Sequence, residues 1–419
     1  MKNRNVFWLG IVSFFTDMSS DMIFPVLPIF LSSVLGVPKA MIGLIDGFGE
    51  AVASLLKGAS GVWSDRIHRR KKLVVIGYSL STIVKPFFAL IRTGPQALLL
   101  RGIERAGKGI RTAPRDALIT ESVSDKERGR AFGFQRALDT SGAVLGTLIA
   151  FLFLWYVTRS TNHRIIELSN YHTLFLLSFI PGVIAVVCLL VFVRETVSPR
   201  FPEARPPFVT EALPPVLPYT KQFKKFLFVS VLFQFGSASY SFFVLKAHDI
   251  GIGLAFIPLV YLVYSFIYAL LSKPMGKWSD KIGRHKVLPI GFLAFSLTSL
   301  GFAFSNSALV WLFIGLYGVS LAITDGVSRA YVADINQTSV ARDFMSRPSG
   351  TQGAALRSSR HGATFGLYHM ATGLASLAGA VGFGFLWDRF GATSAFTWSA
   401  ILSALVTFLF LFFSKTARL

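Results

Sequence analysis

The stretch Gly61-Val-Trp-Ser-Asp65-Arg66 returns in the second half of the chain as Gly276-Lys-Trp-Ser-Asp280-Lys281. A second pair, Gly129-Arg-Ala-Phe-Gly133 and Gly362-Ala-Thr-Phe-Gly366, follows in the same order. The copies of this second pair lie further apart, which fits an insertion around residues 341–360, a polar stretch that we expect to be a mobile inner loop. The two halves of the chain are therefore predicted to be repeats with the same orientation.

The composition is that of a membrane protein. The 419 residues are 53% hydrophobic and only 15% charged, and 41 of them are Phe. Soluble proteins average about 25% charged residues, so we predict a polytopic membrane protein. A net charge of +21 would suit nucleic acid, but we interpret it as the Lys and Arg excess of cytoplasmic loops. The single cysteine, Cys188, excludes an internal disulfide and a cysteine-based metal site.

Apolar runs of roughly 20 residues between charge clusters predict twelve membrane-spanning helices. The Pro-rich stretch 194–225 is predicted to be a cytoplasmic linker between an N-terminal bundle, residues 1–193, and a C-terminal bundle, residues 226–419. The first apolar run is interrupted by Asp17 and Asp21, so we expect a retained span rather than a signal peptide. The predicted spans are 6–34, 41–63, 73–91, 97–121, 131–155, 173–193, 226–245, 251–273, 287–305, 308–333, 363–386 and 394–413.

The positions of Lys and Arg predict the topology. If both termini lie inside, the inner segments hold 26 of these residues. The outer loops then hold only six: Lys39, Arg92, Arg159, Arg164, Lys246 and Arg389. This asymmetry predicts a multi-pass protein of the inner (plasma) membrane with cytoplasmic N- and C-termini.

The repeated stretches carry a family resemblance. The segment from Gly61 through Asp65, Arg66 and Arg69 resembles the signature of loop 2–3 in the major facilitator superfamily, with His68 where Gly is usual. The second copy, which keeps that Gly, contributes Gly276, Asp280, Lys281 and Arg284. Ala113-Pro114 with Glu127–Ala131, and Arg105-x-x-Lys108-Gly109, are similar to the family's motifs in span four and in the connection to span five.

This resemblance implies an all-α membrane protein with twelve transmembrane helices in two pseudo-symmetric six-helix bundles. It also implies that spans one, four, seven and ten line a central cavity, that the protein is a monomer, and that the repeated loop motifs form a gate latch. We interpret this latch as an Asp at an inner helix end that caps a facing helix, together with an Arg that bridges to the other half of the protein. The alternative for the basic residues is simple positive charge on an inner loop.

Charge within the spans predicts the site. An ionisable side chain at the bilayer centre costs about 3 kcal/mol or more unless it faces protein or water. At ~1.5 Å per residue, Asp17 lies near the middle of span one, and Asp21 lies one turn further on the same face. Carboxylates in such surroundings exchange protons with the solvent under the control of nearby cations. The proton-coupling candidates are Asp17, Asp21, Glu50 and Asp139.

A stripe of cations on span four is the main candidate for recognising a substrate. Arg101, Arg105, Lys108 and Arg111 are spaced by three and four residues, so they share one helix face. They would repel one another unless carboxylates or an anionic ligand lie opposite. The alternative is a set of static ion pairs that only hold helices together. The predicted substrate-binding residues are Arg101, Arg105, Lys108, Arg111, Gln234, Tyr240, Asp325 and Arg329.

The sequence has no Walker loop and no cluster with metal-ligand spacing, so we predict neither an enzyme nor a cofactor or metal site. We predict a secondary active transporter of a small organic solute, anionic or amphipathic, coupled to protons and without a nucleic-acid partner. One alternative is a proton antiporter that exports drug-like or metabolite-like compounds. Another is a carrier of a carboxylate or siderophore, and a third is a membrane receptor that moves nothing.

Overall fold

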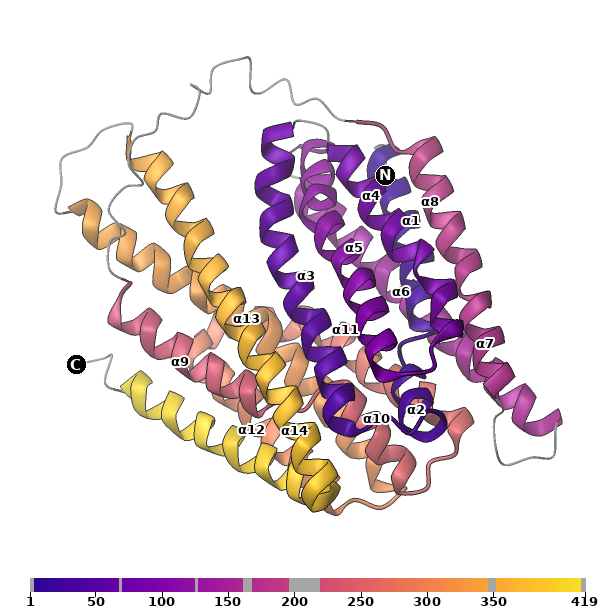
Figure 1. Cartoon of the computed structure of the whole chain (residues 1–419). Helices are drawn as coiled ribbons and strands as arrows, with labels where there is room; N and C mark the ends of the chain where they lie inside the picture. Colours follow the sequence, from indigo (N-terminus) through magenta and orange to yellow (C-terminus); the bar gives the residue numbers. More distant parts are fainter. Residues whose placement is uncertain are drawn as a thin grey trace.

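The computed structural model describes residues 4–67, 70–124, 127–160, 168–195, 219–345 and 352–415. Within these ranges every regular element is a helix, and Figure 1 shows the helices gathered into two bundles. The α-helices are α1 (Arg4–Asp21), α2 (Leu27–Ile29), α3 (Lys39–Ile67), α4 (Arg70–Ile83), α5 (Gly94–Glu121), α6 (Arg128–Ser160), α7 (Leu168–Leu177), α8 (Phe179–Phe192), α9 (Lys221–Gly236), α10 (Tyr240–Asp249), α11 (Ile257–Ile282), α12 (Arg284–Phe304), α13 (Leu309–Met345) and α14 (Gln352–Lys415). Short 3-10 or π segments cover Phe30–Val34, Lys85–Leu90 and Leu254–Phe256.

The described helices account for the twelve predicted spans. By length and composition, 8 helical segments of the described chain are apolar enough to cross a membrane. The last of them, 364–414, contains two predicted spans that meet at Gly391, where a φ of +84° breaks the helix. The three remaining spans are α1, α3 and α5, which lie among the others in the N-terminal bundle but carry more charge.

Several spans that we predicted to be continuous are interrupted. The first span ends as an α-helix at Asp21 and continues through turns and α2 into a π segment. The third changes to a 3-10 helix at Lys85, next to Pro86, and the seventh breaks between α9 and α10. Proline removes a backbone donor and crowds the preceding turn, which explains the break at Pro86 and also favours the one that contains Pro25.

The stretch 341–360, which we expected to be a loop, is largely helical. α13 continues through residue 345, and α14 already begins at residue 352, so the loop prediction was wrong for these parts. Its Ala, Arg, Gln and Met residues are good helix formers, and this local preference exceeded the effect of the polar composition. Residues 346–351 lie outside the described chain.

Glycine contacts in the two bundles are arranged alike. A Cβ atom at Gly142 or Gly146 of α6 would overlap the carbonyl groups of Phe14 or Met18 on α1. In the second bundle, a Cβ at Gly379 of α14 would overlap the carbonyl of Phe235 on α9 in the same way. Spans one and five, and spans seven and eleven, therefore pack backbone to backbone, as expected for two repeats.

Four helices present apolar stripes outward. On α12 the exposed side chains are Ile290, Leu293, Leu297, Leu300 and Phe304, which follow helical spacing. Comparable exposed apolar residues lie on α4, on α8 and on the second part of α14. These helices are spans nine, three, six and twelve, which carry little charge within their limits. Such stripes suit contact with lipid.

The two bundles touch at one end and separate at the other (Figure 1). Near the start of α3, a Cβ at Gly43 or Gly47 would overlap backbone atoms of Ala380 or Leu377 on α14. Towards the other end of the helices, a Cβ at Gly58 would meet no described neighbour within 4 Å, and the same holds for Gly276 and Gly366. The closed end is the one that we predicted, from the positions of Lys and Arg, to lie outside.

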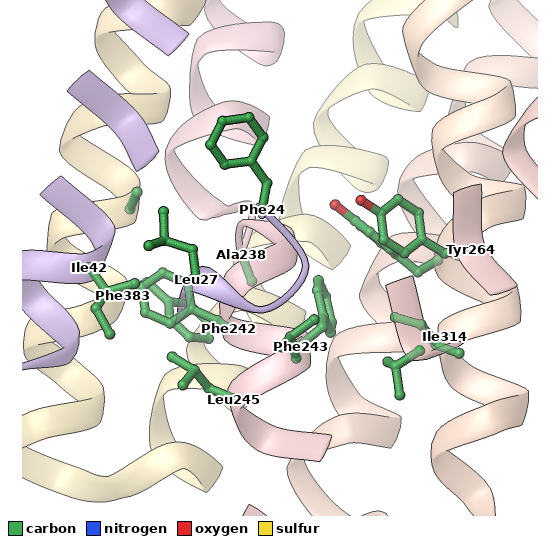
Figure 2. Close-up of a cluster of buried hydrophobic side chains, with 14 of the residues drawn as sticks. Phe24, Leu27, Ile42, Ala238, Phe242, Phe243, Leu245, Tyr264, Ile314 and Phe383 are labelled. Carbon is green, nitrogen blue, oxygen red and sulfur yellow. The ribbon is translucent and has the colours of Figure 1, made fainter. Parts of the chain in front are cut away.

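A buried apolar cluster fills the closed end. Figure 2 shows Phe24 and Leu27, which follow α1, above Ala238 and Phe242 of the other bundle. Ile42 of α3 and Phe383 of α14 continue the cluster, and the rings of Phe242 and Phe383 lie 4.5 Å apart. These side chains are all below 9% exposed. They form an apolar layer that borders the polar cavity described in the next subsection.

Candidate functional site

A polar cavity of about 180 Å³ lies between the bundles. It brings together most of the residues predicted for coupling and binding, and it adds Ser20, Phe24, Glu104 and Tyr261. The lining residues are Asp17, Ser20, Asp21, Phe24, Arg101, Glu104, Arg105, Lys108, Arg111, Tyr240 and Tyr261. The predicted stripe on span four thus faces one common space, with carboxylates of α1 beside it.

Two of the four cations are neutralised by glutamates. Arg101 is 2% exposed, donates to Glu104 over 3.1 Å, and stacks with its guanidinium 3.7 Å from the centre of the Phe24 ring. Arg105 forms an ion pair with Glu50 of α3, with 2.5 Å between Nη2 and Oε1. The buried Nε atoms of both arginines have no hydrogen-bond acceptor among the described residues. The Arg101–Glu104 pair lies within α5 and neutralises buried charge, whereas the Arg105–Glu50 pair joins α5 to α3.

A third cation is held by polar and aromatic contacts. Arg111 is 4% exposed and donates to the hydroxyl of Ser81 over 2.5 Å. Its guanidinium lies 4.3 Å from the centre of the Tyr78 ring. Glycine makes this packing possible, because a Cβ at Gly77 of α4 would lie only 2.6 Å from the Cβ of Arg111. Arg111 is therefore anchored to α4 rather than free in the cavity.

Two further charged groups of the cavity, Lys108 and Asp17, have no bound partner among the described residues. Within the described chain, the ammonium of Lys108 makes no ion pair or hydrogen bond, and its side chain is exposed to the cavity. The carboxylate of Asp17 likewise has no ion pair or hydrogen bond among these residues. They attract one another across the cavity, and Asp139 of α6 lies close enough to repel Asp17. One unpaired cation therefore faces one unpaired anion.

The C-terminal bundle contributes hydroxyl groups. Tyr261 of α11 donates to Asp21 over 3.3 Å, and Tyr240 of α10 donates to the carbonyl of Phe24 over 3.3 Å. Beside the cavity, Ser239 donates to Asp46 of α3 over 2.9 Å. Each of these bonds joins the two bundles, so the far wall of the cavity belongs to the second repeat.

Lys85 lies behind the cavity. It is 0% exposed, and its ammonium donates to Ser19 over 2.6 Å and to the carbonyl of Thr16 over 3.4 Å. This lysine of the third span therefore faces protein. It holds α1 beside the turn at which the first span is interrupted.

The remaining candidates lie outside the cavity. Asp139 accepts a hydrogen bond from Gln135 over 3.0 Å, and Gln234 lies on α9. Asp325 forms an ion pair with Arg329 over 2.7 Å and accepts from Tyr268 over 2.7 Å. Tyr268 also accepts from Arg136 of α6 over 3.4 Å, so this second polar network joins the bundles nearer their separated ends.

The repeated loop motifs are only partly described. Gly61, Asp65 and Arg66 lie in the last turns of α3, the side chains of Asp65 and Arg66 are outside the described set, and Arg69 is outside the described residues. In the second copy, Gly276, Asp280 and Lys281 close α11, and Arg284 opens α12.

Arg284 binds within its own half. Its guanidinium forms an ion pair with Asp280 over 3.1 Å, a second with Asp334 of α13, and a hydrogen bond with the carbonyl of Ala330 over 2.6 Å. Among the described contacts it does not reach the N-terminal bundle, so the bridge that we expected between the halves is not made by Arg284 here.

Sequence reasoning missed one carboxylate between the bundles. Asp388 of α14 accepts hydrogen bonds from the backbone N–H groups of Lys39, over 3.0 Å, and Ala40, over 2.9 Å, at the start of α3. The signal was present: Gly384-x-x-x-Asp388-Arg389-x-Gly391 has the spacing of Gly276-x-x-x-Asp280-Lys281-x-Gly283. It was overlooked because it lies at the opposite end of a span.

Comparison with known proteins agrees with this arrangement. A family model described as the Major Facilitator Superfamily matches residues 9–245 and again residues 226–418. The chain belongs to the Major Facilitator Superfamily. The second match begins at the start of the C-terminal bundle, and the two matches together span nearly all of this MFS protein.

Three similar proteins illustrate the range of the family. An uncharacterized MFS-type transporter of Methanocaldococcus jannaschii is 34% identical over 418 residues, which cover 98% of this chain and 95% of that one. The multi-drug resistance efflux pump PmrA of Streptococcus pneumoniae is 26% identical over 298 residues, 69% of each chain. The crystal structure of the nucleoside transporter NupG has a TM-score of 0.73 at 15% identity and covers 99% of this chain and 100% of that chain.

Proposed function

We propose that this MFS protein is a proton-coupled secondary transporter of a small organic solute with an anionic group. The bundles of residues 1–193 and 226–419, joined by a linker over 194–225, would rock around the cavity so that it opens to each side in turn. The observation that carries the proposal is the polar cavity between the bundles, in which Lys108 and Asp17 remain unpaired. A static bundle would be more stable with apolar residues at these positions, which argues against a non-transporting receptor.

The arrangement of the bundles supports an inward-facing state. The closed end contains the Lys39 end of α3, and the separated end contains the ends of α3 and α11 with Asp280 and Lys281, which the predicted topology places in the cytoplasm. In this orientation both termini are cytoplasmic, the protein lies in the inner (plasma) membrane, and it works as a monomer. Solute would then reach Lys108 from the cytoplasm in the arrangement described above.

A second candidate is export of drug-like compounds in exchange for protons. The similarity to the efflux pump PmrA and the aromatic rings of Phe24, Tyr240 and Tyr261 favour it. The cavity volume of about 180 Å³ favours a smaller solute, because pockets for drug-sized ligands hold about 300–1,000 Å³. A siderophore would be too large for the same reason.

Transport in proteoliposomes tests the proposal. A panel of small carboxylates is added on one side, and a pH-sensitive dye trapped inside reports proton movement. We expect at least one carboxylate to drive a proton flux that Asp17→Asn abolishes while the protein remains in the membrane. Asp249→Asn changes an exposed carboxylate at the end of α10 and should leave the flux intact. Solute movement that is independent of pH would contradict proton coupling, and no solute movement would contradict transport.

A further inference from the structure

We propose that the solute is a compact zwitterion, whose anionic group binds at Lys108 and whose cationic group binds at Asp17. This inference rests on the proposed function, because it names the class of solute that the transporter would carry. The charges around the cavity support it. A ligand is complementary to those charges that the protein itself leaves unpaired.

All other charged groups of the lining are already bound. Arg101 and Glu104 pair with each other, Arg105 pairs with Glu50, and Arg111 donates to Ser81. Asp21 accepts from Tyr261. Lys108 and Asp17 remain, with opposite charges and without direct contact to each other in the described chain. A ligand with one negative and one positive group would pair with both of these charges.

The size and lining of the cavity limit the rest of the molecule. A volume of about 180 Å³ suits a molecule of amino-acid size. The lining is mostly polar, with Phe24 among its few apolar members, and the hydroxyls of Tyr240 and Tyr261 are already donated. The part of the solute between its two charges is therefore expected to be short. A monoanion is the rival ligand, since a proton on Asp17 would also balance the charge.

Binding to the purified full-length protein separates these cases. The probes are linear ω-amino acids of three to six carbons and the common α-amino acids, each compared with the matched carboxylate and the matched amine. Isothermal titration at pH 7 should show at least one zwitterion that binds about ten-fold more tightly than either matched compound, which is the factor that one charge-assisted hydrogen bond provides.

Two substitutions assign the ends of the ligand. Asp17→Asn should remove the preference for the zwitterion over its matched carboxylate, and Lys108→Gln should remove the preference over its matched amine. Thermal unfolding of both variants checks that they are folded. If no zwitterion binds more tightly than its matched carboxylate, the zwitterion proposal is wrong. Proton-coupled movement of a plain carboxylate in proteoliposomes would then still support the proposed function.

Independently, we infer that Asp388 and the start of α3 form a latch that keeps the outer end closed. Both carboxylate oxygens of Asp388 bind the first N–H groups of α3, which have no acceptor within the helix. The ammonium of Lys39 turns away and donates to Ser32 over 2.8 Å. The contact is thus between a carboxylate and a helix N-terminus, which the helix dipole strengthens.

Close packing of α3 on α14 supports this latch. A Cβ at Gly384 would overlap the carbonyl of Lys39, and Gly43 meets Ala380 one turn further along α3. Gly384 and Asp388 repeat the spacing of Gly276 and Asp280, which lie at the opposite end of their span. The same short motif therefore occurs at both ends of the molecule, and the outer copy crosses between the bundles.

Distances between spin labels test this latch. Labels at Arg92→Cys and Ser307→Cys, both exposed at the outer end, are placed in a Cys188→Ser background. Asp388→Ala should raise the ratio of long to short distances about five-fold, the factor expected for loss of one helix-capping side chain. Asp388→Asn keeps one acceptor oxygen and should give a smaller change. It is the control that distinguishes loss of the latch from misfolding of the Ala variant. Asp249→Ala should give none. A distribution unchanged in Asp388→Ala overturns the latch.

Discussion

At the scale of single residues, the N-terminal bundle holds its buried charges by close pairing. Arg101 and Glu104 are each 2% exposed, and the guanidinium also covers the Phe24 ring. A buried ion pair adds little to stability compared with apolar side chains, but removing one partner leaves a bare charge. The energetic importance of such a pair is therefore visible only when its two members are changed separately and together.

Arg101→Met should lower the free energy of unfolding by roughly 3–5 kcal/mol, because Glu104 would remain buried without its main partner. The double change Arg101→Met with Glu104→Leu should recover most of that loss. Thermal unfolding of the detergent-solubilised protein measures both. A double variant no more stable than the single one would contradict this account.

Lys85 differs, because its partners are a hydroxyl and a carbonyl rather than a carboxylate. Lys85→Met keeps the volume and removes a buried cation, so the unfolding temperature is expected to stay the same or to rise. Lys85→Ala opens a cavity and should cost about 2–4 kcal/mol. Unfolding curves recorded side by side provide the comparison, and a Met variant as unstable as the Ala variant would show that the charge itself is required.

At the scale of helices, glycine sets how closely the spans approach. Gly146 of α6 lies against the carbonyl of Met18, whereas Gly133 of the same helix has no described neighbour within 4 Å of an added Cβ. Gly146→Val should therefore lower the free energy of unfolding by about 1–3 kcal/mol or more. Gly133→Ala is the matched control and should be neutral or slightly stabilising. Equal effects in both variants would argue against close packing of α1 on α6.

Much of the helix arrangement could be predicted from sequence. Apolar length and charge asymmetry located the spans, and the spacing Gly142-x-x-x-Gly146 is one that permits close helix approach. The interruptions at Asp21 and Lys85 had a local signal in Pro25 and Pro86, whereas the break between α9 and α10 contains no proline and could not be predicted in this way. These breaks place Phe24 in the cavity and Ser239 against Asp46. The sequence therefore identified the cation stripe of α5 and Tyr240 opposite it, but not Phe24 or Tyr261.

At the scale of the whole molecule, the closed end and the separated end differ in their accessibility to solvent. Gly58 on α3 is exposed towards the separated end, whereas Ala380 is 3% exposed and packs on Gly43 at the closed end. In a Cys188→Ser background, Gly58→Cys should react with a membrane-impermeant thiol reagent applied from the cytoplasmic side, at least about ten-fold faster than Ala380→Cys. Labelling is followed by mass shift. Similar rates at both positions would mean that the closed end opens freely.

The corner at Gly391 has a mechanical consequence. The eleventh and twelfth spans are joined there by a single residue in a left-handed conformation, with no connecting loop. Because no flexible loop connects them, a tilt of the part of α14 before Gly391 must move the part after Gly391 as well. The outward side of this second part carries the apolar stripe that suits contact with lipid. Membrane thickness and lateral pressure are thereby coupled to the helix that carries Asp388, so the lipid composition of the bilayer should itself tune how readily the outer end opens.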